Sequence, residues 1–257
     1  MKELLDLVYA PRSSWGDDVR LKFNTALNAR YPRIQDLTDK RNDERRFQLR
    51  VNTSIQNDSV PYAALIPPGQ ELSGQYGGMS FVIFPADEDG QPALISLGIG
   101  TNGLAPDEAI LGRPGHGRKS AAIASWLNGL TNDGYAWAKR DPVRIDLDMP
   151  SATRHSLTPW EKTCSRYGKV LYAVFKPPAN RSEASDRVVL KALTAFIDLF
   201  FEERRIEPKS AFSEDAERLR DEWLARALPT TTDAQVQALL ALRRFVIIEG
   251  PPGHRQD

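Results

Sequence analysis

The stretch GGMSFVIFPADEDGQPALISLGIGTNG, residues 77–103, decides the fold of this chain. It holds two apolar runs, residues 79–84 and 93–99, on either side of the acidic sequence DEDG at residues 87–90. Aspartate and glycine favour tight turns, because aspartate side chains bond to the nearby backbone and glycine accepts unusual backbone angles. The pattern therefore predicts a β-hairpin.

Four further segments have the patterns of strands. Residues 47–51 alternate in polarity, residues 60–66 form an apolar run that ends in Pro-Pro-Gly, and residues 169–175 are mostly apolar up to a Pro-Pro pair. Residues 143–148 alternate apolar and charged side chains, as in a strand with one solvated face. Together with the hairpin, these segments predict a sheet that is mostly antiparallel.

Amphipathic helices are predicted around the sheet. Apolar side chains recur at helical spacing in residues 17–30, 119–130 and 186–204. Residues 33–46 are densely charged and residues 101–118 are rich in glycine and proline, so both are expected to be connections. The expected fold class is α+β, a mostly antiparallel sheet flanked by helices and followed by a helical connector and the first strand of a P-loop domain.

The carboxyl-terminal part of the chain has the pattern of an approach to a phosphate-binding loop. Helices are predicted at residues 216–228 and 232–242, and a strand at residues 245–248. The first part of a nucleotide loop follows, formed by Gly250, Pro251, Pro252 and Gly253. A complete loop, G-x-x-x-x-G-K-[ST], supplies a lysine to the phosphates and a hydroxyl to magnesium. Because both residues are missing, we expect that this chain is not an enzyme and binds no nucleotide.

The tail GHRQD, residues 253–257, has a second property. It can be encoded by bases that read GTGKT in the frame one nucleotide later, which completes the phosphate loop. We therefore interpret the tail as the product of a frameshift that truncates the Walker A motif, whether by sequencing error, gene damage or a programmed slip. An unrelated natural or vector-derived tail is the alternative.

Composition excludes several classes of protein. The 257 residues carry no net charge and are 41% hydrophobic, which is enough for a core and gives no global field that attracts nucleic acid. One cysteine and three scattered histidines predict neither a disulfide framework nor a metal site, and no motif predicts a cofactor. No segment has the length of a membrane span, so we expect a cytoplasmic protein without membrane contact.

Two parts of the sequence resemble McrB-like AAA+ restriction proteins. Residues 239–253, LLALRRFVIIEGPPG, are similar to the entry into the AAA+ motor of that family. Residues 60–66, VPYAALI, and the hairpin at residues 77–103 are similar to its amino-terminal DNA-binding domain. The resemblance implies DNA binding in a restriction or phage-defence system, an NTPase in the full-length protein and an McrC-like nuclease as partner. The best-known type of this domain reads methylated cytosine by flipping the base into a pocket.

The resemblance and the local patterns together divide the chain into three parts. Residues 1–180 are expected to form the α+β domain that recognises DNA. Residues 181–230 are expected to form the helical connector, and residues 231–257 the truncated start of the AAA+ domain.

A basic, glycine-rich segment ahead of the helix at residues 119–130 is the best candidate for a DNA contact. It carries Arg113, His116, Arg118 and Lys119. Backbone amides at a helix start, together with such cations, hold phosphate groups. A solvated loop with ordinary surface charges is the alternative interpretation.

A pocket for a flipped base also needs an aromatic wall. Tyr62, Tyr76 and Trp15 are the candidates, and Tyr76 stands out because glycines surround it in the sequence SGQYGG. Packing in the core is the alternative for each of them. Trp126 lies on the apolar face of a predicted helix and is expected in the core.

No hydrolase motif is present, since neither a nucleophile elbow nor an ordered triad accompanies the histidines. Asp146 and Asp148 are expected on a solvated strand face. The first hypothesis is therefore a DNA-binding module, with recognition of a modified base as its more specific form. The alternatives are a protein-binding adaptor of an AAA+ ATPase without DNA contact, and a sensor of a small molecule or nucleotide signal.

Overall fold

The computed structural model describes residues 1–208 apart from residues 17, 33, 35–36, 38–45, 55, 57–58, 71–77, 101–113, 142–143, 203 and 205. The chain divides into two compact units, Met1–Lys209 and Ser210–Asp257, and the described residues belong to the first. The boundary expected at residue 180 lies inside this first unit. The carboxyl-terminal helices, strand and phosphate loop predicted above all lie outside the described residues.

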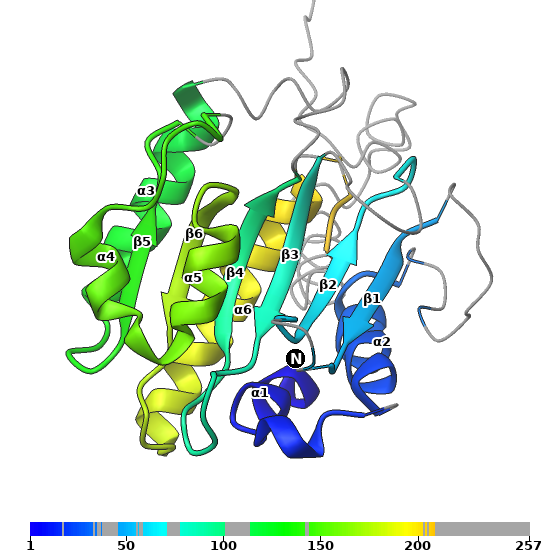
Figure 1. The fold of residues 1–257 in the computed structure, drawn as a ribbon. Coiled ribbons are helices and arrows are strands. Elements are labelled where there is room, and N and C mark those ends of the chain that lie inside the picture. The colour runs from blue at the N-terminus through cyan, green and yellow to red at the C-terminus, as the bar shows by residue number, and fades with distance from the viewer. Residues whose placement is uncertain are drawn as a thin grey trace, which may run out of the picture. The chain divides into compact units, whose positions relative to one another are not determined.

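The core of the fold is a six-stranded sheet, so the α+β class predicted from the sequence is confirmed (Figure 1). The strand order is β1-β2-β3-β4-β6-β5, and all neighbours are antiparallel. The strands are β1 (Gln48–Asn52), β2 (Tyr62–Ile66), β3 (Met79–Phe84), β4 (Leu94–Ile99), β5 (Tyr135–Ala138) and β6 (Leu171–Lys176).

The hairpin predicted from residues 77–103 is confirmed. β3 and β4 pair from Met79 opposite Ile99 to Phe84 opposite Leu94. Gly90 in the connecting turn has a φ of 92°, a left-handed angle that favours glycine. Every residue of both strands is buried, as expected for strands in the middle of a sheet.

Helices cover the two faces of the sheet unequally. One face packs against α1 (Lys2–Val8), α2 (Asp18–Arg30), α3 (Pro114–Asn128) and α6 (Glu183–Glu202). The other face packs against α5 (Glu161–Tyr167). On the same side, Thr153 of α4 (Ser151–Ser156) forms a hydrogen bond with the Tyr135 hydroxyl of β5 at 3.1 Å. Figure 1 shows α6 behind the sheet and α5 in front of β4 and β6, and in the described part of the chain no helix lies in front of β1, β2 and β3.

The larger of the two hydrophobic cores joins α1, α2 and α6 to the sheet. The helical spacing predicted for residues 186–204 is confirmed, because α6 buries Val189, Leu193, Phe196 and Phe200. At the edge of this core, Asp198 of α6 accepts a hydrogen bond from Arg30 Nε at 2.7 Å and another from the Tyr31 hydroxyl. α6 is therefore packed and hydrogen-bonded within the unit that contains the sheet.

The strand predicted at residues 143–148 is wrong. Residues 145–147 form a turn, in which Asp146 pairs with Arg144 at 2.8 Å. The buried ammonium of Lys139 binds the carbonyl oxygens of Arg144 and Leu147, at 3.2 and 2.8 Å. The Lys139 ammonium therefore draws these two carbonyls together in a turn, instead of leaving them spaced along an extended strand.

Sequence patterns do not predict three of the short elements. β5, α4 and α5 have only 4, 6 and 7 residues, too few for a hydrophobic period to identify them. α3 also begins at Pro114 rather than at Lys119, consistent with the preference for proline at the first position of a helix. Within the described ranges, no helix is both long enough and apolar enough to cross a membrane.

Candidate functional site

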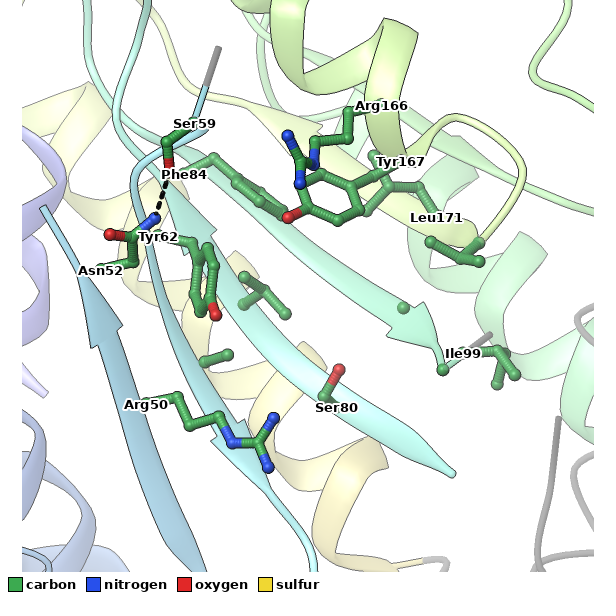
Figure 2. A pocket seen from close by; sticks show the side chains of 15 residues that line it. Arg50, Asn52, Ser59, Tyr62, Ser80, Phe84, Ile99, Arg166, Tyr167 and Leu171 are labelled. Atoms are coloured by element: carbon green, nitrogen blue, oxygen red, sulfur yellow. Dashed lines mark hydrogen bonds between the residues drawn. The ribbon is translucent and has the colours of Figure 1, made fainter. Parts of the chain in front are cut away.

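A cleft of about 540 Å³ lies on the half of the sheet that no described helix covers, beside α5. We define the cleft by Arg50, Tyr62, Ser80, Gly98, Arg166 and Tyr167, which all line it. Strands β1–β4 supply its floor, and α5 with the segment after it supplies one wall (Figure 2). Its volume is within the range of sites that bind small molecules.

The strand register determines what the floor of the cleft presents. Arg50 of β1 lies opposite Ala64 of β2, and Ser80 of β3 lies opposite Gly98 of β4. Because Ala64 and Gly98 are small, they leave space above the sheet. Figure 2 shows the Arg50 side chain extending across this low part of the floor toward Ser80.

Aromatic rings form the other end of the cleft. The ring centroids of Tyr62 and Phe84 are 6.3 Å apart, and those of Phe84 and Tyr167 are 5.5 Å apart. Phe84 is buried, whereas Tyr62 and Tyr167 are partly exposed. The two tyrosine rings therefore offer accessible surface on which a flat ligand can stack.

Two guanidinium groups border the same cleft. Arg50 comes from β1 and Arg166 comes from α5. The Cζ atom of Arg166 lies 5.9 Å from the centroid of the Tyr167 ring, within the range of a cation–π contact. A flat ligand that carries an anionic group could stack on the tyrosine rings while the two guanidinium groups attract its negative charge.

Asn52 also lines the cleft, but its amide is engaged in the connection between β1 and β2. Its Nδ2 donates to Ser59 Oγ at 2.8 Å and to the Val60 carbonyl at 3.1 Å. Its Oδ1 accepts from the backbone N–H of Ser54 at 3.1 Å. Asn52 therefore holds the backbone that leads into Tyr62, rather than contacting a ligand.

The acidic turn of the hairpin holds α5 in place. The Asp87 carboxylate accepts a hydrogen bond from the backbone N–H of Lys162 at 3.1 Å, in the first turn of α5. The backbone N–H of Asp87 donates to the Pro159 carbonyl at 2.9 Å, and Arg12 donates to the Asp87 carbonyl at 2.8 Å. A carboxylate at the start of a helix satisfies free N–H groups and complements the helix dipole, so Asp87 fixes the helix that carries Tyr167.

The segment after α5 is tied to the sheet and to a buried lysine. The backbone N–H of Ile99 donates to the Val170 carbonyl at 2.8 Å. The ammonium of Lys139 donates to the Lys169 carbonyl at 2.6 Å. These two bonds hold the wall of the cleft next to the end of β4.

Tyr62 is the predicted contact residue that the structure places in the cleft, whereas Trp15 and His116 are buried. Trp15 is 6% exposed and His116 is 3% exposed. His116 Nε2 lies 3.3 Å from the Tyr172 hydroxyl, within the core under the sheet. Trp15 and His116 therefore lie in the core on the helix-covered face of the sheet and do not line the cleft, which corrects the sequence prediction for both.

The remaining basic candidates do not converge on the cleft. Arg118 and Lys119 are exposed on α3, which packs on the opposite face of the sheet. Lys119 Nζ forms an ion pair with Glu202 at 2.6 Å. A contact of Arg118 and Lys119 with DNA stays a prediction. Arg113 and Tyr76 lie outside the described residues.

Trp126 corrects another expectation, since its side chain is not in the core. It is 45% exposed on α3, and the Lys191 ammonium lies 5.8 Å from its ring centroid. The next residue of α3, Leu127, is fully buried and takes the core position. The sequence places both residues on one apolar side of the helix, and only the position of α6 decides which of them is covered.

The structure adds five residues to the candidate site, namely Arg50, Ser80, Gly98, Arg166 and Tyr167. Arg50 gives the clearest sequence signal, because it is a cation at an alternating position of a predicted strand. The pattern does not show that its face of the sheet is uncovered. In the described ranges, no group of three His, Cys, Asp or Glu side chains is placed to hold a metal ion.

Cys164 of α5 is expected to be unreactive in the folded protein. Its side chain is 2% exposed, and burial raises the pKa of the thiol to about 11. Since the thiolate is the nucleophile, an increase of about two pKa units leaves about a hundredfold less of it at neutral pH. Titration with an aromatic disulfide should show slow reaction in buffer and fast reaction in denaturant. Equal rates in both would show that α5 is not packed as described.

Comparison with protein-family models, with curated proteins and with solved structures finds no match for this chain.

Proposed function

We propose that this chain is the DNA-recognition module of an McrB-like restriction or phage-defence protein, and that its cleft receives a base turned out of the duplex. One observation supports this proposal: the rings of Tyr62 and Tyr167 share a cleft with the guanidinium groups of Arg50 and Arg166. An extruded base stacks on aromatic rings, while cations hold the phosphates beside it. In the full-length system, an NTPase motor and an McrC-like nuclease would act on the DNA that this module selects.

The floor of the cleft supports recognition of the edge of the base. The Ser80 side chain lines the floor beside the Arg50 guanidinium group (Figure 2). A serine hydroxyl can both donate and accept a hydrogen bond, so it can pair with the amino or carbonyl groups of a base edge. Stacking alone does not distinguish bases, and a polar floor is what a module that selects a modified base requires.

The proposal predicts that Tyr62→Ala and Arg50→Ala both weaken DNA binding, but in different ways. Loss of a stacking ring should lower affinity about tenfold, since each stacked base contributes about 1–3 kcal/mol. Loss of the guanidinium should weaken binding to all sequences and lower the salt slope by about one. Fluorescence anisotropy with matched duplexes containing cytosine, 5-methylcytosine or 5-hydroxymethylcytosine, over a salt series, measures both effects.

Trp126→Ala is the matched control, because it removes an exposed aromatic side chain from the opposite face of the sheet. Its affinity and salt slope should equal those of the wild type. A 2-aminopurine beside the target base should also brighten on binding, as the base stack opens. If the wild type binds no duplex, or if Tyr62→Ala and Trp126→Ala bind equally well, the cleft is not a DNA site.

The protein-binding adaptor remains a second candidate, and one observation favours it. Trp126 borders a shallow hollow between α3 and α6, together with Leu190 and Ala195. An exposed tryptophan beside apolar side chains is typical of protein interfaces. Under this alternative, the wild type would bind an McrC-like subunit in calorimetry and no duplex, and Trp126→Ala would abolish that binding.

A further inference from the structure

Gly98 occupies a position in the middle of the sheet where a glycine needs an explanation. It lies in β4, opposite Ser80 of β3 and opposite Leu171 of β6, and it lines the cleft. Glycine in a strand loses backbone entropy on folding and gives the sheet no side chain to pack. A structural or functional requirement must therefore account for it.

The backbone conformation does not require this glycine. The glycines with positive φ in the described part of the chain are Gly69, Gly78 and Gly90. The pairing of β4 with β6 shifts between Leu97 and Gly98, but a bulge demands glycine only where its φ is positive. Gly98 is not in that region, so another residue can adopt its backbone angles.

Packing does not require the glycine either. A Cβ atom at residue 98 would lie 3.6 Å from the Val170 carbonyl oxygen, 3.9 Å from Leu171 Cδ2 and 3.9 Å from Ser80 Oγ. These are ordinary van der Waals distances, so a methyl group fits without displacing its neighbours. What the glycine provides is room for a methyl-sized group on the cleft side of β4.

We propose that Gly98 is a specificity-determining residue, which sets the size of the ligand group that can approach β4. The inference rests on the proposed function, in which the ligand is an extruded base. Three chemically different groups surround the space next to Gly98: the Ser80 hydroxyl, the Val170 carbonyl oxygen and a Leu171 methyl group. Because a carbonyl has two lone pairs, the Val170 oxygen can accept a second bond besides the one from Ile99. This corner fits a base edge with an N–H donor next to a small substituent.

The test compares Gly98→Ala and Gly98→Val with the wild type on duplexes whose target cytosine carries hydrogen, methyl or hydroxymethyl at C5. Each added carbon at residue 98 takes space from the ligand, so affinity should fall most for the largest substituent. We expect the ratio of affinities for the hydroxymethyl and unsubstituted duplexes to fall about tenfold in Gly98→Val and less in Gly98→Ala. The Tm of Gly98→Ala should stay the same or rise by about 1–3 °C, because alanine is better than glycine in a strand.

Gly16→Ala is the matched control, since a Cβ there meets no atom within 4 Å and Gly16 does not line the cleft. It should leave all three affinities unchanged. The inference is overturned if the Gly98 variants bind every duplex as the wild type does, if they weaken all duplexes by the same factor, or if Gly98→Ala clearly lowers Tm. If the wild type itself binds none of the duplexes, the proposed function fails, and the inference that rests on it fails too.

Discussion

Replacing Lys139 with Met is expected to lower the free energy of unfolding by about 2–3 kcal/mol, because three backbone carbonyl groups lose the charged donor that holds them together. The Lys139 side chain is 5% exposed. Its ammonium donates to three backbone carbonyls, those of Arg144 at 3.2 Å, Leu147 at 2.8 Å and Lys169 at 2.6 Å. Methionine has a similar length and no donor, so the volume is kept while the bonds are lost. Urea denaturation followed by tryptophan fluorescence measures the change.

The same variant should alter how stability depends on pH. Burial lowers the pKa of Lys139 below its ordinary value of 10.5, against the opposing effects of Asp148, Asp146 and Asp141. Between the folded and unfolded pKa values the unfolded chain binds more protons, so the stability contributed by this group rises with pH and levels off near 10.5. The stability difference between wild type and Lys139→Met should therefore grow as pH rises toward 10.5.

Lys176→Met is the control for both measurements. Lys176 is partly buried, and its ammonium makes a single bond of 3.3 Å, to the Ser156 carbonyl. A single long bond contributes about 0.5–1 kcal/mol, so this variant should be only slightly less stable than the wild type. If the two methionine variants lose equal stability, the three bonds of Lys139 do not hold the turn at residues 144–147.

Lys139 also shows where local sequence patterns stop predicting the fold. The hairpin and α6 follow from periodicity, because neighbouring residues decide whether a run is a strand or a helix. Residues 143–148 have an equally regular alternation, yet a turn forms because a buried ammonium binds their carbonyls. The position of that ammonium depends on contacts that reach as far along the chain as the Lys169 carbonyl. A window of a few residues does not contain such contacts.

The sequence predicts fewer of the residues of the candidate site than of the elements of the fold. Tyr62 could be predicted because it lies in a clear strand and is aromatic. Arg50 and Tyr167 are equally part of the cleft, but their contribution depends on which half of the sheet α5 leaves open. The sequence also fails to predict the exposure of Trp126 and Trp15, since helix packing exposes the first and buries the second.

Replacing Gly168 with Ala is expected to destabilise the protein by about 2–3 kcal/mol and to weaken binding in the cleft, because the new Cβ has no space. It would lie 2.5 Å from the Cys164 carbonyl oxygen, 2.6 Å from Asp148 Oδ1 and 2.8 Å from Arg154 Nη2. The two side-chain ends can move, but the carbonyl belongs to the backbone of α5. The clash is therefore relieved by a shift of the α5 end, which carries Tyr167. Thermal denaturation and anisotropy with the duplexes above measure the two effects.

Two variants decide whether this steric explanation holds. Gly129 follows α3 as Gly168 follows α5, but a Cβ there would lie 3.4 Å from its nearest contact, so Gly129→Ala should be close to wild type in stability. Asp148→Ala combined with Gly168→Ala removes one of the three clashes, so the double variant should lose less stability than the sum of the two single variants. Rescue should remain partial, because the contact with the Cys164 carbonyl is unchanged. If Gly168→Ala is as stable as Gly129→Ala, the wall of the cleft is not held by close packing at Gly168, and the position of Tyr167 needs another cause.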